Sequence, residues 1–586
     1  MANKEDIEDN AKFTVRDLLV KYKDRVDNSK IQFLQNKSPE KDEIIIDLSK
    51  LIEEFKDEII SEKNWAKVHK IGQRLWKNLI SCALNNIDPN SKGNSTLYEY
   101  LKDATKFEDL LYGLEDFYRD HTLHSLWVYL IGDTLLREDL KLIYNNLNWY
   151  LCNDIKKEQK IYGYKDILVK GSEQKKKGIC KSVNENKDAC WCIIALCHDL
   201  GYSLAKLDAL NERISKVMKF YDVSNYTDVG YSLDIEHQHL ISQFLELMAM
   251  DVRIEPSEDF NDSEYYTELY GLKEKVDEFQ EKKGLAYEKK KKEYEVKLEE
   301  NVSIKCYRDD STFWRLCRAL EKKEHGILSS YLIYKVLGIF AESSVRGSAE
   351  EWELNDREAK RNIIRGDILF AIAQHEFSFA HINQLGSLAD ILIIADELEE
   401  FSRYGRPKLS LNYYSTTAET FISFTNEKKD GKIKPGEDIN LIMEYTSQHQ
   451  TEEEFFGFLG RKTKRLCSIY SLEKSKDDEI EEGNEKENYC TINSIRMNFR
   501  WNDPKNNDKP KGASKPYYVH ISKTPKDNKA FLPIKEVNGQ QEYDLKIYDD
   551  KLCLVKLDNM TLDEYLIKVG EFNEENKKNI TEKKSY

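Results

Sequence analysis

The sequence lacks the features that mark membrane and secreted proteins. No apolar stretch approaches the roughly 18 residues needed to cross a bilayer. The first residues, MANKEDIEDN, are acidic and polar, with no cationic segment followed by an apolar one. The 11 cysteines include no CxxC pair, which argues against a thiolate metal site. We therefore expect a soluble cytoplasmic protein in which Cys190, Cys192 and Cys197 are free thiols of a helical core.

A basic net charge is also lacking, because 106 acidic residues outnumber 90 lysines and arginines. The net charge is −16 and the pI is about 5.4, whereas a duplex-DNA binder needs cations to neutralise phosphates. The composition argues against a nucleic-acid partner but allows a small anionic substrate, because a metal and a few arginines can reverse the local field. The GxxxxGK[ST] loop and the GxSxG elbow, which mark phosphate cradles and serine nucleophiles, are missing.

What the sequence does contain is apolar periodicity over a long chain. With 586 residues, of which 40% are hydrophobic and 33% charged, several units are expected. Apolar residues at three- and four-residue spacing predict helices for 1–110 and for a core at 111–410. The charge-dense stretch 251–305 predicts an exposed helical insertion within that core. Alternating and β-branched segments in 411–586 predict a separate α+β domain, so the fold class is mainly α.

The candidate chemistry centres on the dipeptide His198-Asp199. It ends the apolar run IIALCHDLGY, which places two ionisable side chains at the edge of a core. Such groups are costly to bury unless they are paired or bind a metal. Four other metal-competent residues lie in comparable apolar helical frames: His124, His325, His375 and Asp396.

In this order the residues resemble the H…HD…D pattern of the HD-domain metal-dependent phosphohydrolase superfamily. His124, His198, Asp199 and Asp396 match that pattern. Members with two metals add histidines in frames similar to HGILSS and AIAQHE, which His325 and His375 match. The resemblance covers about 111–250 and 311–410, and it implies an all-helical core that holds one or two divalent ions. Manganese, iron, cobalt, nickel, zinc and magnesium all suit such ligands.

Some features depart from the family pattern or leave alternatives. Glu376 stands where two-metal phosphodiesterases often have a second histidine, and it either replaces a ligand or faces solvent. The GYP tripeptide of cyclic-di-GMP hydrolases is absent, although Gly201-Tyr202 follows the HD dipeptide. His237 and His239 compete with His325 for the third-histidine role. We favour His325 because Ser329 follows it at the expected spacing.

The resemblance implies that a metal-activated water attacks a phosphorus atom, with Asp199 bridging two ions. His198, Asp199 and His121 are then the catalytic candidates; His121 is a general acid, a phosphate contact or a group that orients His124. Cationic residues near the ligands are candidates for binding substrate phosphate. They are Arg119, Lys206, Arg403 and Arg406.

The expected function is hydrolysis of a nucleotide phosphoester or phosphoanhydride, with a (deoxy)nucleoside triphosphate as the leading substrate on family grounds. Three alternatives use the same frame: a cyclic nucleotide or dinucleotide phosphodiesterase, a di-iron oxygenase, and a non-catalytic nucleotide-sensing module. A nucleotide is the expected ligand, and a second copy or a protein partner would dock through the N- or C-terminal regions.

Overall fold

The computed structural model describes the chain in segments. These are 15–34, 39–61, 65–89, 92–111, 117–137, 185–221, 223, 229–231, 238–256, 302–340, 352–354, 356–377, 384–385, 387–401, 403–405, 418–425, 438–447, 458–459, 462, 490–501, 516–522, 536–537, 540–541 and 546–548.

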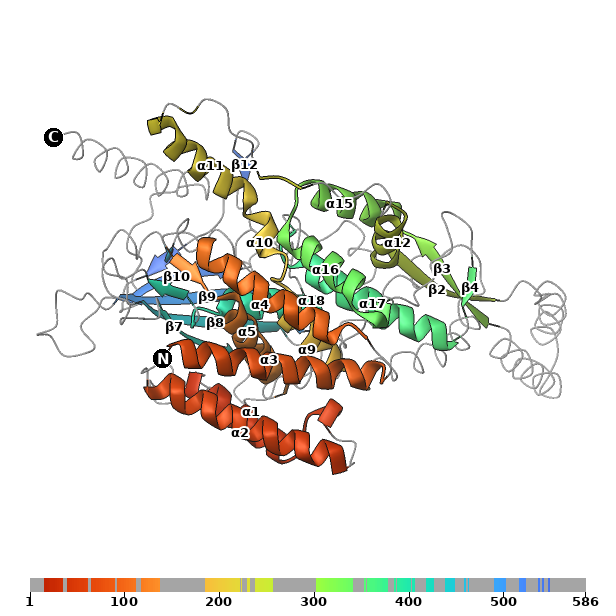
Figure 1. The fold of residues 1–586 in the computed structure, drawn as a ribbon, viewed down its shortest axis with the longest axis horizontal. Helices are drawn as coiled ribbons and strands as arrows, with labels where there is room; N and C mark the ends of the chain where they lie inside the picture. Colours follow the sequence, from red (N-terminus) through yellow and green to blue (C-terminus); the bar gives the residue numbers. More distant parts are fainter. Residues whose placement is uncertain are drawn as a thin grey trace, which may run out of the picture.

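The described residues form a mainly α-helical protein (Figure 1). The N-terminal helices are α1 (Val15–Asp27), α2 (Pro39–Ser61), α3 (Trp65–Ile87) and α4 (Asn94–Leu111). The helices that follow are α5 (His121–Arg137), α9 (Lys187–Cys197), α10 (Tyr202–Ala205), α11 (Leu207–Met218), α12 (Gln238–Met248), α15 (Asp310–Glu321), α16 (His325–Val336), α17 (Asp356–Gln374) and α18 (Leu388–Leu398). Short 3-10 turns occur at Gln32–Leu34, Lys219–Tyr221 and Gly338–Phe340.

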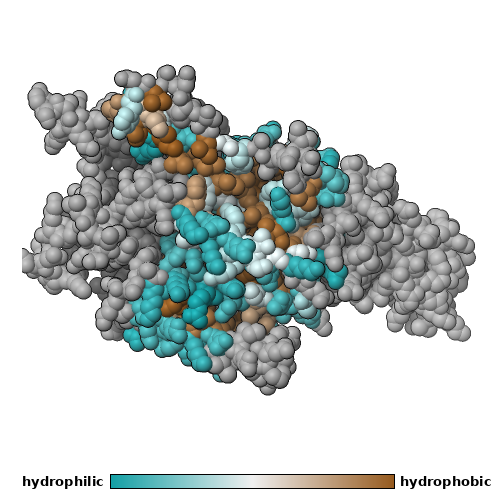
Figure 2. Space-filling view, viewed as in Figure 1, coloured by the Kyte–Doolittle hydropathy of each residue, from teal (hydrophilic) through white to brown (hydrophobic). Residues whose placement is uncertain are grey.

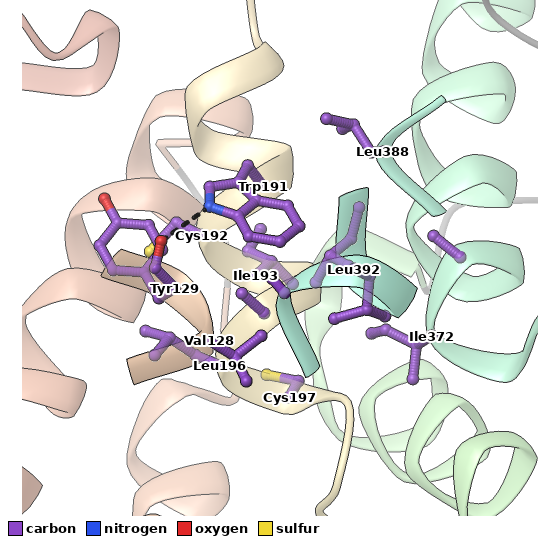
Figure 3. Close-up of a cluster of buried hydrophobic side chains, with 14 of the residues drawn as sticks. Val128, Tyr129, Trp191, Cys192, Ile193, Leu196, Cys197, Ile372, Leu388 and Leu392 are labelled. Carbon is purple, nitrogen blue, oxygen red and sulfur yellow. Dashed lines mark hydrogen bonds between the residues drawn. The ribbon is translucent and has the colours of Figure 1, made fainter. Parts of the chain in front are cut away.

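Helix α9 is the centre of the core. All of its residues are buried, and it packs against α3, α5 and α17. Figure 3 shows Trp191 and Ile193 of α9 between Val128 and Tyr129 on one side and Ile372 and Leu392 on the other. The indole of Trp191 donates a hydrogen bond to the Tyr129 carbonyl at 3.1 Å. An apolar helix enclosed in this way explains why the sequence shows a continuous apolar run at this position.

The cysteines of α9 agree with the expected core thiols. Cys190, Cys192 and Cys197 are buried and unbridged. Burial raises the pKa of each of these thiols. They pack as small apolar side chains.

Helix α11 and the 3-10 turn that follows it carry exposed apolar side chains. They are Val217 of α11 and Phe220 and Tyr221 of the turn, and Figure 2 shows hydrophobic side chains gathered at this end of the molecule. Helices α3 and α4, by contrast, present mostly hydrophilic residues to the viewer.

The helical prediction for the insertion at 251–305 is wrong at both of its ends. β2 (Met250–Pro256) and β3 (Val302–Arg308) form an antiparallel pair, to which β4 (Trp352–Leu354) adds a third strand. Val252 and Ile254 alternate with polar residues, as do Ile304 and Cys306; this period of two favours strands. The high charge of the segment between them, which lies outside the described residues, masked that signal.

Most of the other strands follow residue 383. A mixed sheet has the order β13-β10-β9-β8-β7, and β5 also pairs with β9; only the β8–β9 pair is parallel among these strands. The strands are β5 (Gln384–Leu385), β7 (Ala418–Thr425), β8 (Asp438–Ser447), β9 (Cys490–Trp501), β10 (Pro516–Ser522) and β13 (Lys546–Tyr548). Two further antiparallel pairs are β1 (Phe117–Arg119) with β6 (Arg403–Gly405), and β11 (Glu536–Val537) with β12 (Gln540–Gln541). The domain boundaries at 110 and 410 stay a prediction.

No helix among the described residues is long and apolar enough to cross a membrane.

Candidate metal centre

Five helix ends converge on one buried point. His124 lies in the first turn of α5, and His198-Asp199 follows α9 directly. His325 begins α16, His375 follows α17, and Asp396 lies in the last turn of α18. These five helix ends therefore bring together all six residues selected from the sequence as metal ligands, with His198 and Asp199 coming from the same one.

The first half of the centre surrounds His124. Its Nε2 atom lies 3.1 Å from Nε2 of His198, 3.3 Å from Oδ2 of Asp199 and 3.1 Å from Oδ1 of Asp396. The two histidines are completely buried. Ligand atoms at right angles around an ion with bonds of about 2.1 Å lie about 3.0 Å apart, so these spacings fit one shared ion.

The second half of the centre surrounds His325. Its Nε2 atom lies 3.0 Å from Nε2 of His375 and 3.0 Å from Oδ1 of Asp199. Oδ1 of Asp199 is also 3.5 Å from Nε2 of His375. Asp199 thus directs one carboxylate oxygen to His124 and His198, and the other to His325 and His375.

The outer nitrogen of each histidine is held by an acceptor. Nδ1 of His124 is 2.6 Å from Oε2 of Glu399, and Nδ1 of His325 is 2.8 Å from Oε1 of Glu376. Nδ1 of His198 and of His375 face the carbonyls of Ala195 and Ile372 at 2.9 and 2.6 Å. Because these partners accept, each Nδ1 carries the proton, and in the neutral ring Nε2 presents a lone pair to the centre.

Such a set of atoms could hold a cation among them. Burial lowers the pKa of His198 to about 3, and the charge of Asp199 offsets this only in part, so its ring is neutral near pH 7. Burial alone would raise the pKa of Asp199, but the surrounding histidines, His198 first among them, hold it well below its usual range. Lone pairs of nitrogen and carboxylate oxygens about 3 Å apart repel one another unless a proton or metal ion lies between them. The donor set therefore fits a divalent ion of the transition series.

Without a metal, a proton on His325 supplies part of this positive charge. Burial alone would lower the pKa of His325, but hydrogen bonds to Asp199 and Glu376 outweigh it and raise the pKa to about 10. Glu376 also accepts the backbone N–H of Gly326 at 3.1 Å. Glu376 therefore neither joins the ligand atoms nor simply faces solvent, which were the two readings of the sequence; it orients His325.

Close backbone contact fixes the loop after the HD dipeptide. The N–H of Gly201 donates to Oγ of Ser329 at 2.7 Å, and that hydroxyl donates to the carbonyl of His325 at 2.8 Å. A Cβ atom at Gly201 would lie 2.5 Å from the same carbonyl oxygen. Glycine permits this approach of α10 to α16. Ser329 stands four residues after His325 because its hydroxyl links the His325 carbonyl to the N–H of Gly201.

The remaining sequence candidates have different positions. Nε2 of His121 is 4.0 Å from Oδ2 of Asp199, and its ring lies 4.0 Å from that of Tyr202. Glu399, rather than His121, holds the outer nitrogen of His124. Nζ of Lys206 lies 4.7 Å from the centre of the same Tyr202 ring. His121 and Lys206 thus flank the centre through a shared aromatic ring.

The arginine candidates are described only in part. The backbones of Arg119 and Arg403 are directly paired between β1 and β6, close in sequence to His121 and to the end of α18. Arg406 and His237 lie outside the described residues. His239 is exposed on α12, whereas His325 lies beside His375 and Asp199 in the centre.

Glu399 is the main site residue that the sequence did not reveal. It is completely buried, yet ELEEF reads as the charged end of a helix. The sequence signal that could have identified it is its spacing of three residues from Asp396, which would place both side chains on one face of a helix.

Comparisons with protein-family models, with curated proteins and with solved structures return no match. The centre is a buried cluster of histidine and aspartate side chains that could hold a metal ion.

Proposed function

We propose that this protein is a metal-dependent phosphohydrolase of the HD-domain type that cleaves a phosphoester or phosphoanhydride bond of a nucleotide. The observation that carries the proposal is the position of Asp199 within one cluster of histidines: its Oδ2 faces His124 and His198, and its Oδ1 faces His325 and His375. This arrangement, with the ligand order along the chain, is what a two-ion HD centre requires.

Six side chains would hold the ions. His124, His198 and Asp396 with Oδ2 of Asp199 would form one site, and His325 and His375 with Oδ1 of Asp199 the other. Divalent ions held there would lower the pKa of a water molecule toward neutrality and neutralise charge on phosphoryl oxygens.

The residues around the ligands would position substrate and protons. Glu399 and Glu376 keep the rings of His124 and His325 in the tautomer that offers Nε2. His121, close to Asp199 and in contact with the Tyr202 ring, would exchange a proton with the substrate. Lys206 beside the same ring supplies a cation for phosphate.

A (deoxy)nucleoside triphosphate is the leading substrate. A cyclic nucleotide or dinucleotide is the second candidate, because a carboxylate placed between two histidine pairs suits a two-ion phosphodiesterase. The acidic net charge of −16 makes a large nucleic-acid substrate a poorer fit.

The test is a product assay with purified protein. Nucleoside triphosphates, cyclic nucleotides and cyclic dinucleotides are incubated with Mg²⁺, Mn²⁺, Co²⁺ or Fe²⁺, beside Asp199→Ala and His325→Ala. His239→Ala, on an exposed histidine, is the matched control.

We expect turnover in the wild type and in His239→Ala, and loss in the other two variants. Tripolyphosphate plus nucleoside indicates the first substrate class, and a linearised nucleotide the second. Oxygen consumption with iron would indicate an oxygenase instead, and nucleotide binding without turnover a sensing module. Hydrolysis that persists in Asp199→Ala would refute the assignment of this centre.

A further inference from the structure

Helix α18, which supplies Asp396, is held at both ends by segments from later in the chain. Just before it, Gln384 and Leu385 of β5 pair with Thr491 and Cys490 of β9. Just after it, Lys462 contacts the end of the helix. Helix α18 packs against α5, α17 and α9 of the helical core and also contacts β5 and β7.

Lys462 forms a buried ionic contact there. Its Nζ lies 2.6 Å from Oε1 of Glu400 and 3.5 Å from Oε2 of Glu397. Glu400 is completely buried and Lys462 nearly so. The ammonium also lies 5.9 Å from the centre of the buried Tyr445 ring of β8. Charges so far from water are destabilising unless their partners stay in place, so this contact fixes the position of the chain after α18.

The same stretch of chain carries two parts of the metal centre. Glu399, which holds His124, is the direct neighbour of Glu400 in sequence, and Asp396 precedes Glu400 by four residues. A movement that releases Glu400 from Lys462 therefore moves the hydrogen-bond acceptor of one ligand and the backbone of another.

We propose that Lys462 is a positioning residue through which the C-terminal part of the chain sets the affinity of the centre for metal. The inference rests on the proposed function, because it assumes that the centre binds metal. Lys462 contacts no ligand atom; it acts through Glu400 on Glu399 and Asp396. By linkage the effect is reciprocal: metal binding stabilises the packing of the C-terminal strands against α18.

The decisive comparison uses two buried ion pairs, each beside a helix that carries a ligand. Lys462→Met removes the ammonium next to α18. Arg25→Met is the matched control, because Arg25 forms a buried pair with Asp133 at 2.5 Å, on the α5 helix that carries His124. Co²⁺ affinity of the full-length chain is measured by visible absorption, and the free energy of unfolding by denaturant titration without metal.

We expect both variants to be less stable, and only Lys462→Met to bind Co²⁺ more weakly, by at least about fivefold. The double variant Lys462→Met/Glu400→Gln removes both charges and should recover part of that affinity. If Lys462→Met does not fold, Glu400→Gln alone tests the same contact with a side chain of the same shape.

The inference is wrong if Lys462→Met and Arg25→Met lose stability alike while both bind Co²⁺ as the wild type does. Absence of Co²⁺ binding in the wild type would overturn the inference together with the metal centre, and that titration alone identifies this case. A second readout is hydrogen exchange of β8 in the wild type, which should become faster when chelator removes the metal. Equal exchange with and without metal would contradict the proposed linkage.

Discussion

The buried contact between Glu399 and His124 gives the sharpest test of the centre. The two side chains are completely buried, with Oε2 of the carboxylate 2.6 Å from Nδ1 of the ring. Glu399→Gln retains the shape and an oxygen acceptor but removes the negative charge that makes the imidazole a stronger ligand. Replacing an outer-shell partner of this kind typically lowers metal affinity about 10- to 100-fold, which corresponds to about 1.4–2.8 kcal/mol.

The assay is a Co²⁺ titration of Glu399→Gln beside the wild type, followed by visible absorption, which also reports the coordination geometry. Glu321→Gln, on an exposed glutamate of α15, controls for the loss of one negative charge. Its affinity should stay within about twofold of the wild type, because an exposed charge is screened by solvent.

An unchanged affinity in Glu399→Gln would refute the view that Glu399 tunes His124. Complete loss of Co²⁺ binding in a variant that keeps its fold would show that Glu399 is itself a ligand. In either case, the roles assigned to His124 and Glu399 in the first ion site would be wrong.

Three further predictions follow from the same geometry. Gly201→Ala should lower the free energy of unfolding by about 1–3 kcal/mol, measured in denaturant, because its Cβ would lie 2.5 Å from the backbone oxygen of His325; wild-type stability would contradict this. Metal binding should release a proton from His325, whose pKa is raised from 6.5 to about 10 in the fold without metal. This proton stabilises that fold fully below pH 6.5, and the stabilisation is lost as the pH rises through 10. Metal affinity should therefore rise by up to roughly tenfold per pH unit between these values, and calorimetry in two buffers should detect the proton; an affinity independent of pH would refute it. The three buried cysteines of α9, whose thiol pKa values burial raises, should react with iodoacetamide only after unfolding, which peptide mass mapping would show; rapid labelling of the folded protein would mean that α9 is not enclosed.

The helical core and the set of six candidate ligands were predictable from the sequence. Each ligand stands at or near the end of an apolar helical stretch, where an ionisable side chain is costly unless something compensates for it. His198-Asp199 after IIALC and Asp396 in LADILIIAD are clear cases. The strand ends of the 251–305 segment were missed because the pattern of period two was short and the charge density around it was high.

The sequence by itself determined which side chains are forced to the edge of the core, because burial of apolar residues depends on periodicity along the chain. Only the tertiary structure decided how they meet: that Asp199 faces two histidine pairs, that Glu399, 275 residues after His124, holds its ring, and that Lys462 secures the end of α18. These contacts join distant parts of the chain, and the charged residues that make them have the same local pattern as solvated ones. Their role is set by which helix ends the fold brings together.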